Sequence, residues 1–278
     1  MPHGCSLPAG FPPVSVPPPA PDSDALRARL YARYRSASPD GADVPLAVRQ
    51  QQAQSHLLRI VDRCFPPDRG AVVVDLGCGP GFLLAAARQC GYTAVRGIDH
   101  APEQVEAART LGIGGVEQGD LSATLAALAP GSLDAVVMLD VLEHLRRDEL
   151  LPVVDGVWAA LKPGGRWIIQ VPNGESPFFG RLQYGDLTHE TAFTRLSLGQ
   201  VLRVSGFSRT RFFETEPAGR GLRGAVRRAA WRVMRGLLRA WILVETGDSG
   251  RGAVFTQTLL AVGIKDGGAV GNNRDGEA

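Results

Sequence analysis

The residues best placed to do chemistry are an acid and the glycine turn that follows it. An apolar run at 72–74 ends on Asp75, and Gly77, Gly79 and Gly81 precede a helix-like run. This is the pattern of a strand, a tight turn and a helix, where a ligand can lie against bare backbone. Phosphate-binding turns use other spacings, and a carboxylate two residues ahead would repel a phosphate. We therefore expect a ligand with an ammonium group and no phosphate; a turn without a ligand is the alternative.

Further acids stand where the next strands are expected to end. Runs at 93–99, 114–120 and 133–140 end on Asp99, Asp120 and Asp140, and a fifth strand is expected at 166–172. Asp99 lies about 20 residues beyond the turn, the offset at which an acid holds ribose hydroxyls in doubly wound folds. Because ligands of parallel α/β sheets bind at the carboxyl ends of the strands, these acids predict a binding edge.

Five signatures make the chain similar to class I S-adenosylmethionine-dependent methyltransferases. They are Val-Asp-Leu-Gly-Cys-Gly-Pro-Gly at 74–81, Gly-Ile-Asp at 97–99, Gly-Asp-Leu at 119–121, Asp-Val-Leu-Glu-His at 140–144 and Leu-Lys-Pro-Gly-Gly at 161–165. The resemblance covers roughly 45–217 and resumes near 253–265. It implies that the methionine part of the cofactor contacts the turn, the ribose Asp99, and the adenine Asp120 and Leu121. The cofactor-binding residues that it implies are Asp75, Gly77, Cys78, Gly79, Gly81, Asp99, His100, Asp120, Leu121, Leu139 and Asp140.

The same resemblance implies the fold. We expect a doubly wound, Rossmann-like α/β sheet of seven strands, mostly parallel, with an antiparallel C-terminal strand. The last two strands are expected at 207–216 and 254–264, after a helix at 194–206. We expect a disordered tail at 1–21, a helical cap over the active site at 22–66, the methyltransferase domain at 67–265 and a flexible tail at 266–278.

The segment after the fourth strand carries candidate groups for the methyl acceptor. If it is helical, Asp140, Glu143 and His144 share one face at i, i+3 and i+4. Ubiquinone-biosynthesis O-methyltransferases resemble this segment and have a divalent metal there, so the resemblance implies Mg²⁺ on these three residues, with Asp140 in place of the usual glutamate. Such a metal lowers the pKa of an acceptor hydroxyl. In the alternative interpretation Glu143 and His144 only brace the loop.

A second candidate base lies in the polar loop after the fifth strand. His189 stands close in sequence to Asp186 and Glu190, so it could remove the acceptor's proton while a carboxylate orients it. We therefore name His144, His189 and Asp186 as the candidate catalytic residues. A hydrogen bond that only orders the loop is the alternative for His189.

The acceptor is inferred from a further resemblance. The series Pro-Asn-Gly at 172–174, Gly-Asp-Leu-Thr-His-Glu at 185–190 and the arginine-rich insertion resemble methyltransferases of bacterial surface-polysaccharide synthesis. This implies O-methylation of a sugar or glycan hydroxyl. The alternatives are a quinone or phenol O-methyltransferase with a metal, and a non-catalytic scaffold that only binds the cofactor.

The insertion at 218–250 is a basic amphipathic helix by pattern. Its arginines spread over about half of the helical circumference, and apolar residues take the opposite arc. The arginines are those at 220, 223, 227, 228, 232, 235 and 239, and the apolar residues are Leu222, Val226, Ala229, Val233 and Leu237. A helix of this kind can contact anionic lipid peripherally through 220–241. The alternative is a helix docked on its own domain with a solvated basic face.

Composition limits the remaining possibilities. The chain has 278 residues, 44% hydrophobic content and a net charge of +2, enough for one sizeable core and too little charge to drive nucleic-acid binding. The four cysteines lack zinc spacing, and no apolar run has the length of a membrane span. We expect a cytoplasmic protein, located at the inner face of the membrane if the basic helix binds lipid.

Overall fold

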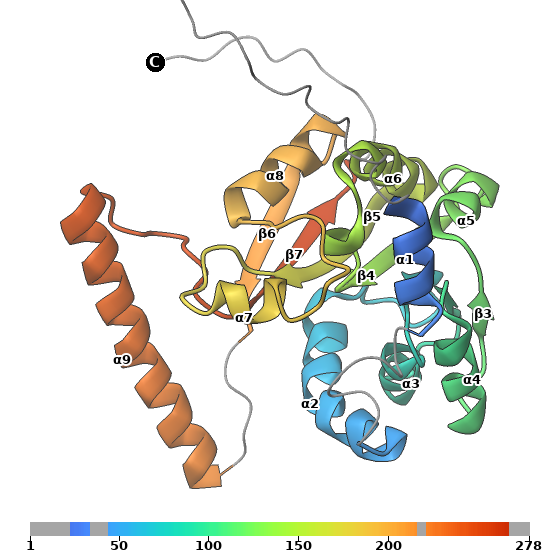
Figure 1. Cartoon of the computed structure of the whole chain (residues 1–278), viewed down its shortest axis with the longest axis horizontal. Helices are drawn as coiled ribbons and strands as arrows, with labels where there is room; N and C mark the ends of the chain where they lie inside the picture. Colours follow the sequence, from blue (N-terminus) through green and yellow to red (C-terminus); the bar gives the residue numbers. More distant parts are fainter. Residues whose placement is uncertain (1–22, 34–43, 216–220, 267–278) are drawn as a thin grey trace, which may run out of the picture.

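The computed structural model describes residues 23–33, 44–215 and 221–266 (Figure 1). The tail expected at 1–21 lies outside the described residues, as does the C-terminal tail beyond residue 266. Two helices precede the sheet, α1 (Ser23–Tyr31) and α2 (Leu46–Cys64), in the region expected to form the cap.

The described residues form one seven-stranded sheet of order β3-β2-β1-β4-β5-β7-β6. Strands β1 to β5 are parallel, and β7 runs antiparallel between β5 and β6. This confirms the doubly wound, mostly parallel fold with an antiparallel C-terminal strand. The strands are β1 (Val73–Leu76), β2 (Val95–Asp99), β3 (Val116–Gln118), β4 (Leu133–Leu139), β5 (Leu161–Pro172), β6 (Arg209–Glu214) and β7 (Thr258–Ile264).

Helices cover both faces of the sheet, so the central strands are buried on both sides. Alternate residues of β1 feed the two cores: Val73 packs with α2 and α3, whereas Val74 packs with α5, α6 and α8. The helices between the strands are α3 (Phe82–Gln89), α4 (Pro102–Thr110), α5 (Leu121–Ala127), η1 (Leu142–His144, a 3₁₀ helix), α6 (Arg147–Ala160), α7 (Phe179–Gln183) and α8 (Arg195–Val204).

The turn between β1 and α3 requires its glycines. Gly77, Gly79 and Gly81 have φ angles of 75°, 53° and 78°, a region that residues with a Cβ seldom adopt. A Cβ on Gly77 would also collide with Val141. The turn therefore brings its backbone close to the segment that follows β4, and this approach closes one side of the site.

The insertion between β6 and β7 forms one long helix, α9 (Gly221–Thr246), which stands beside the domain at the left of Figure 1. Gly224 is its one buried residue. Among the described residues, no helix is both long and apolar enough to cross a membrane.

Candidate active site

A cavity of about 680 Å³ lies at the carboxyl ends of β1, β2 and β4. Most of the predicted cofactor-binding residues line it: Gly77, Gly79, Asp99, His100, Asp120, Leu121, Leu139 and Asp140. Asp75, Cys78 and Gly81 belong to the same strand and turn but are not among the lining residues. Cys78 is buried against β2, where a Cβ added to Gly97 would be 2.6 Å from its Sγ. Its side chain therefore packs in the core.

Asp99 ties the glycine turn to the end of β2. Its carboxylate accepts hydrogen bonds from the backbone N–H of Gly79 (2.7 Å) and of Ala101 (2.9 Å). Burial raises the pKa of Asp99, and the two backbone donors oppose that rise. A carboxylate has about four acceptor positions, so two remain for ligand hydroxyls in the cavity.

Asp75 is a buried carboxyl without a neutralising partner. It is 2% exposed, and its Oδ1 has no hydrogen-bond partner among the described residues. Burial, with repulsion from Asp99, raises its pKa to about 8. A cation held nearby would stabilise its ionised form, because an opposite charge offsets the cost of desolvation.

Asp120 follows β3 and is the N-cap residue of α5. Its Oδ1 accepts a hydrogen bond from the N–H of Ala123 (2.8 Å) at the start of α5. Asp120 and Leu121 both line the cavity. They thus stand on the β3 side of the site, next to His100 and across the cavity from the β4 side.

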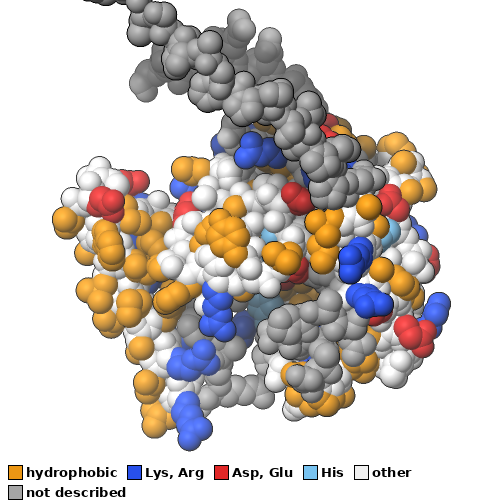
Figure 2. All heavy atoms as spheres, in the orientation of Figure 1, with side chains coloured by type: hydrophobic (Ala, Val, Ile, Leu, Met, Phe, Trp, Pro, Cys, Tyr) orange, Lys and Arg blue, Asp and Glu red, His pale blue; other side chains and the backbone are white. Residues whose placement is uncertain are grey.

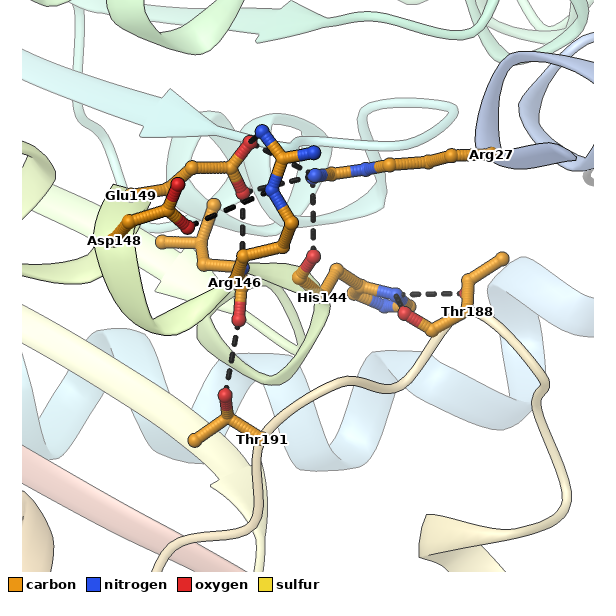
Figure 3. A network of polar contacts seen from close by, with 8 residues as sticks. Arg27, His144, Arg146, Asp148, Glu149, Thr188 and Thr191 are labelled. Carbon is orange, nitrogen blue, oxygen red and sulfur yellow. Dashed lines mark hydrogen bonds and ion pairs between the residues drawn. The ribbon is translucent and has the colours of Figure 1, made fainter. Parts of the chain in front are cut away.

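Helix α1 lies over the cavity and contributes Arg27, Ala28 and Tyr31 to its lining. Arg27 reaches α6, where it pairs with the Glu149 carboxylate (2.8 Å) and donates to the His144 carbonyl (3.1 Å) (Figure 3). The Tyr31 ring contacts the rings of His100 and His144, at centroid separations of 5.9 and 6.3 Å. Sequence reasoning did not identify these residues, because their partners lie between 69 and 122 positions away in the sequence.

Asp140 takes an unusual backbone conformation at the end of β4. Its φ of 56° is the one positive value at a non-glycine residue in the described chain. Its Oδ2 accepts from the Gln170 side chain (2.9 Å), which in turn contacts His56 Nε2 (2.7 Å). Desolvation by the surrounding atoms raises the pKa of Asp140 to about 6. Strained backbone of this kind concentrates at functional sites.

The three residues predicted to bind a metal are not the three that the structure brings together. Asp140 does not begin an α-helix, and η1 starts only at Leu142, so the i, i+3, i+4 geometry does not form. Instead, Glu143, His144 and His189 bring their ligand atoms within 4.8 Å of one another. We call these three residues the Glu143 cluster. Asp140 accepts a hydrogen bond from Gln170 and does not belong to this cluster, in which His189 takes its place.

The loop after β5 folds over η1 and builds this cluster. The N–H groups of Glu190 and Thr191 donate to the Glu143 carbonyl, at 2.7 and 3.0 Å. The rings of His144 and His189 stand 4.7 Å apart, centroid to centroid. Both segments are held by backbone contacts, so the cluster is fixed in place.

Asp186 is linked to His144, whereas the sequence led us to expect that it would orient His189. The Thr188 hydroxyl lies 2.8 Å from His144 Nδ1 and donates to Asp186 Oδ1 at 2.6 Å (Figure 3 shows His144 and Thr188). His189 Nδ1 lies instead 3.2 Å from the Gln183 carbonyl. Asp186 therefore reaches His144 through Thr188, and a backbone carbonyl orients His189.

The electrostatics of the cluster favour neutral groups. Burial, reinforced by Asp140 and Asp186, raises the pKa of Glu143 well above its ordinary value, and neither of its carboxyl oxygens has a hydrogen-bond partner among the described residues. Burial and the neighbouring His189 lower the pKa of His144 to about 4. At neutral pH the His144 imidazole is uncharged, and Glu143 is the stronger base once ionised.

Comparison with known proteins agrees with this architecture. The model of a family described as "Methyltransferase domain" matches residues 49–210, and the chain belongs to that family. Its fold and its signatures are those of the class I S-adenosylmethionine-dependent methyltransferases.

A curated relative is the ubiquinone biosynthesis O-methyltransferase of Xanthomonas campestris pv. campestris (strain B100). It is 38% identical over 108 residues, which is 37% of this chain and 44% of that protein. The chain thus matches less than half the length of this relative.

Solved structures show the same fold at low identity. A SAM-dependent methyltransferase from Archaeoglobus fulgidus is 19% identical with a TM-score of 0.59, covering 86% of this chain and 99% of that one. One from Mesorhizobium loti is 21% identical with a TM-score of 0.52, covering 77% and 98%.

Proposed function

We propose that this protein transfers the methyl group of S-adenosylmethionine to an acceptor hydroxyl held at the Glu143 cluster. The cluster carries the proposal, because buried bases stand beside a cavity whose acids suit the cofactor. The ammonium group of the cofactor's methionine part would lie near Asp75, the ribose on Asp99 and the adenine between Asp120 and Leu121. His144 lines the cavity and links the two parts.

The reaction is an in-line displacement. The acceptor oxygen attacks the methyl carbon, the carbon–sulfur bond breaks, and S-adenosylhomocysteine leaves. Positioning supplies much of the rate, since the sulfonium methyl is already activated. The hydroxyl proton passes to Glu143 or to a cluster histidine, with Asp186 steadying His144 through Thr188.

A sugar or glycan hydroxyl is the first acceptor class. The support is the loop at 173–190, whose polar residues match the polysaccharide-type resemblance and whose His189 faces His144. A sugar hydroxyl is a weak acid, so this class needs a base such as Glu143.

A quinone-type phenol with a bound metal is the second candidate. Two observations favour it: the metal-compatible spacing of the cluster and the similarity to a ubiquinone biosynthesis O-methyltransferase. One carboxylate and two imidazoles suit Mn²⁺, Fe²⁺ or Zn²⁺ better than Mg²⁺, which prefers oxygen ligands. Such an ion would lower the pKa of the acceptor hydroxyl.

An acceptor screen tests the proposal. Purified protein with S-adenosylmethionine is offered sugars, glycans, catechols and quinols, each with and without a chelator, and S-adenosylhomocysteine is quantified. Product with a sugar in chelator supports the first class, and chelator-sensitive product with a catechol supports the second. Cofactor binding without product from any acceptor would favour the non-catalytic scaffold and contradict the proposal.

A further inference from the structure

Helix α9 exposes a continuous apolar surface on the side that faces away from the domain. Its 26 residues make a rod about 39 Å long. Residues about 3.6 positions apart share this side, and each of them is exposed; Leu222 is 81% exposed, Leu237 61% and Val244 88%. We call this surface the apolar stripe; it consists of Leu222, Val226, Ala229, Val233, Leu237, Ala240 and Val244.

The opposite side of the helix faces the domain and carries both arginines and apolar residues. Arg235 pairs with Glu214 of β6 at 3.1 Å. Half-buried residues, Arg228, Trp231, Arg235, Leu238, Arg239 and Ile242, mark this side. The structure therefore differs from a helix that docks its apolar side and leaves its basic face in water. Figure 2 shows hydrophobic side chains along the outward side of α9.

The charge around the apolar stripe indicates its partner. On a helical wheel, Arg223 flanks the stripe on one side and Arg232 on the other. The helix has six arginines and one acid, Glu245. Trp241 stands at the edge of the stripe and is 68% exposed, in the position that tryptophan favours at a lipid–water boundary.

A second copy of the chain is disfavoured as the partner. Two stripes packed together would bring arginine flanks against arginine flanks, and like charges facing each other oppose association. An anionic bilayer suits both the apolar stripe and the arginines beside it, since the stripe enters the acyl boundary while the flanking arginines meet lipid phosphates. We propose that α9 lays this domain on an anionic membrane surface. The proposal goes beyond methyl transfer and holds for any acceptor.

Co-sedimentation of the full chain with vesicles tests this. The wild type should sediment with phosphatidylcholine vesicles that contain phosphatidylglycerol, should stay in solution with phosphatidylcholine alone, and should bind less at high salt. Val233→Ser with Leu237→Ser should weaken binding about tenfold or more, and so should Arg223→Gln with Arg232→Gln.

The matched control replaces Arg96 and Arg109, exposed arginines of β2 and α4, with glutamine. It removes equal charge on the side of the molecule away from α9 (Figure 1) and should leave binding unchanged. S-adenosylmethionine affinity, measured in every variant, should stay constant and so report an intact fold.

Three outcomes would overturn the proposal. In the first, the wild type stays in solution with anionic vesicles at low salt. In the second, the serine variant binds as tightly as the wild type. In the third, light scattering shows a dimer that Val233→Ser with Leu237→Ser converts to a monomer, which would assign the stripe to a second copy.

Discussion

At the scale of single residues, the carboxyls near three strand ends, of which only Asp75 is buried, have different partners. Asp99 is satisfied by backbone donors, Asp140 accepts from Gln170, and Asp75 has an oxygen without a partner. An unsatisfied buried carboxyl costs stability, so a site that keeps one trades stability for ligand binding. Asp75 is therefore the residue at which stability and cofactor affinity should move in opposite directions.

Replacing Asp75 by Asn should show this trade. Burial raises the pKa of Asp75 to about 8 in the folded protein. The folded state is therefore most stable at acid pH, where this carboxyl is protonated, and it loses stability as the pH rises toward 8. Because Asn does not titrate, Asp75→Asn without cofactor should gain melting temperature over the wild type, by about 4 °C or more at pH 8 and less at pH 5. Its cofactor affinity should fall.

Scanning calorimetry at both pH values provides the measurement. Asp62→Asn, at an exposed position of α2, is the control and should melt like the wild type. An Asp75→Asn melting point that is lower than the wild type at pH 8 would refute the account of this carboxyl.

Glu143 should matter to turnover more than to cofactor binding. Glu143→Gln keeps the shape but removes the base, so turnover should fall about 100-fold while S-adenosylmethionine affinity stays within about twofold. His144→Ala and His189→Ala should likewise lower turnover more than affinity. Wild-type turnover should rise with pH as Glu143 ionises, above the ordinary glutamate range.

The assay is steady-state S-adenosylhomocysteine release with an active acceptor. Glu190→Gln, at an exposed neighbouring glutamate, is the control and should keep its activity. If Glu143→Gln and both histidine variants turn over like the wild type, the proton-transfer role of the cluster is wrong.

At the scale of elements, local sequence patterns were sufficient to predict most of the strands. Strands β1, β4 and β5 contain apolar runs that end near an acid or a glycine turn, so their positions could be read from neighbouring residues. Contacts between distant segments could not be predicted from neighbouring residues. The pairing of Arg27 with Glu149 spans 122 positions, and His189 joins Glu143 only because the loop after β5 folds back over η1.

The segment after β4 and helix α9 show the same limit. The spacing of Asp140, Glu143 and His144 suits an α-helix, but Asp140 adopts a positive φ and leaves the set. For α9 the sequence indicates an amphipathic helix, whereas its orientation depends on Arg235 meeting Glu214 of β6. In both cases tertiary contacts decide which side chains come together, and the local sequence pattern does not show this.

Helix α1 should act as a cover that slows cofactor release. Arg27→Ala removes the contacts to Glu149 and the His144 carbonyl, so S-adenosylmethionine affinity should fall about three- to tenfold, because a partly exposed ion pair is worth about 1 kcal/mol or less and the carbonyl bond adds to it. Isothermal titration calorimetry measures this. Arg29→Ala, on the exposed side of the same helix, is the control. Equal affinity for Arg27→Ala and the wild type would contradict the cover.

At the scale of the whole molecule, the parts have distinct tasks. The sheet edge holds the cavity proposed for the cofactor, α1 covers that cavity, and η1 with the loop after β5 forms the Glu143 cluster, which we propose as the source of the base. Helix α9 stands at the side of the domain and is free of this machinery (Figure 1). Methyl transfer and membrane binding should therefore be separable by mutation.

Calorimetry with S-adenosylmethionine on the wild type, Asp99→Ala and Asp99→Asn tests the central claim, that the cavity at the carboxyl edge is the cofactor site. Asp62→Ala is the control, and melting curves confirm that each variant is folded at the assay temperature. We predict that both Asp99 variants bind at least about tenfold more weakly, because the ribose hydroxyls lose a charged acceptor, while Asp62→Ala binds normally. Equal affinity for the wild type and Asp99→Ala would contradict the claim.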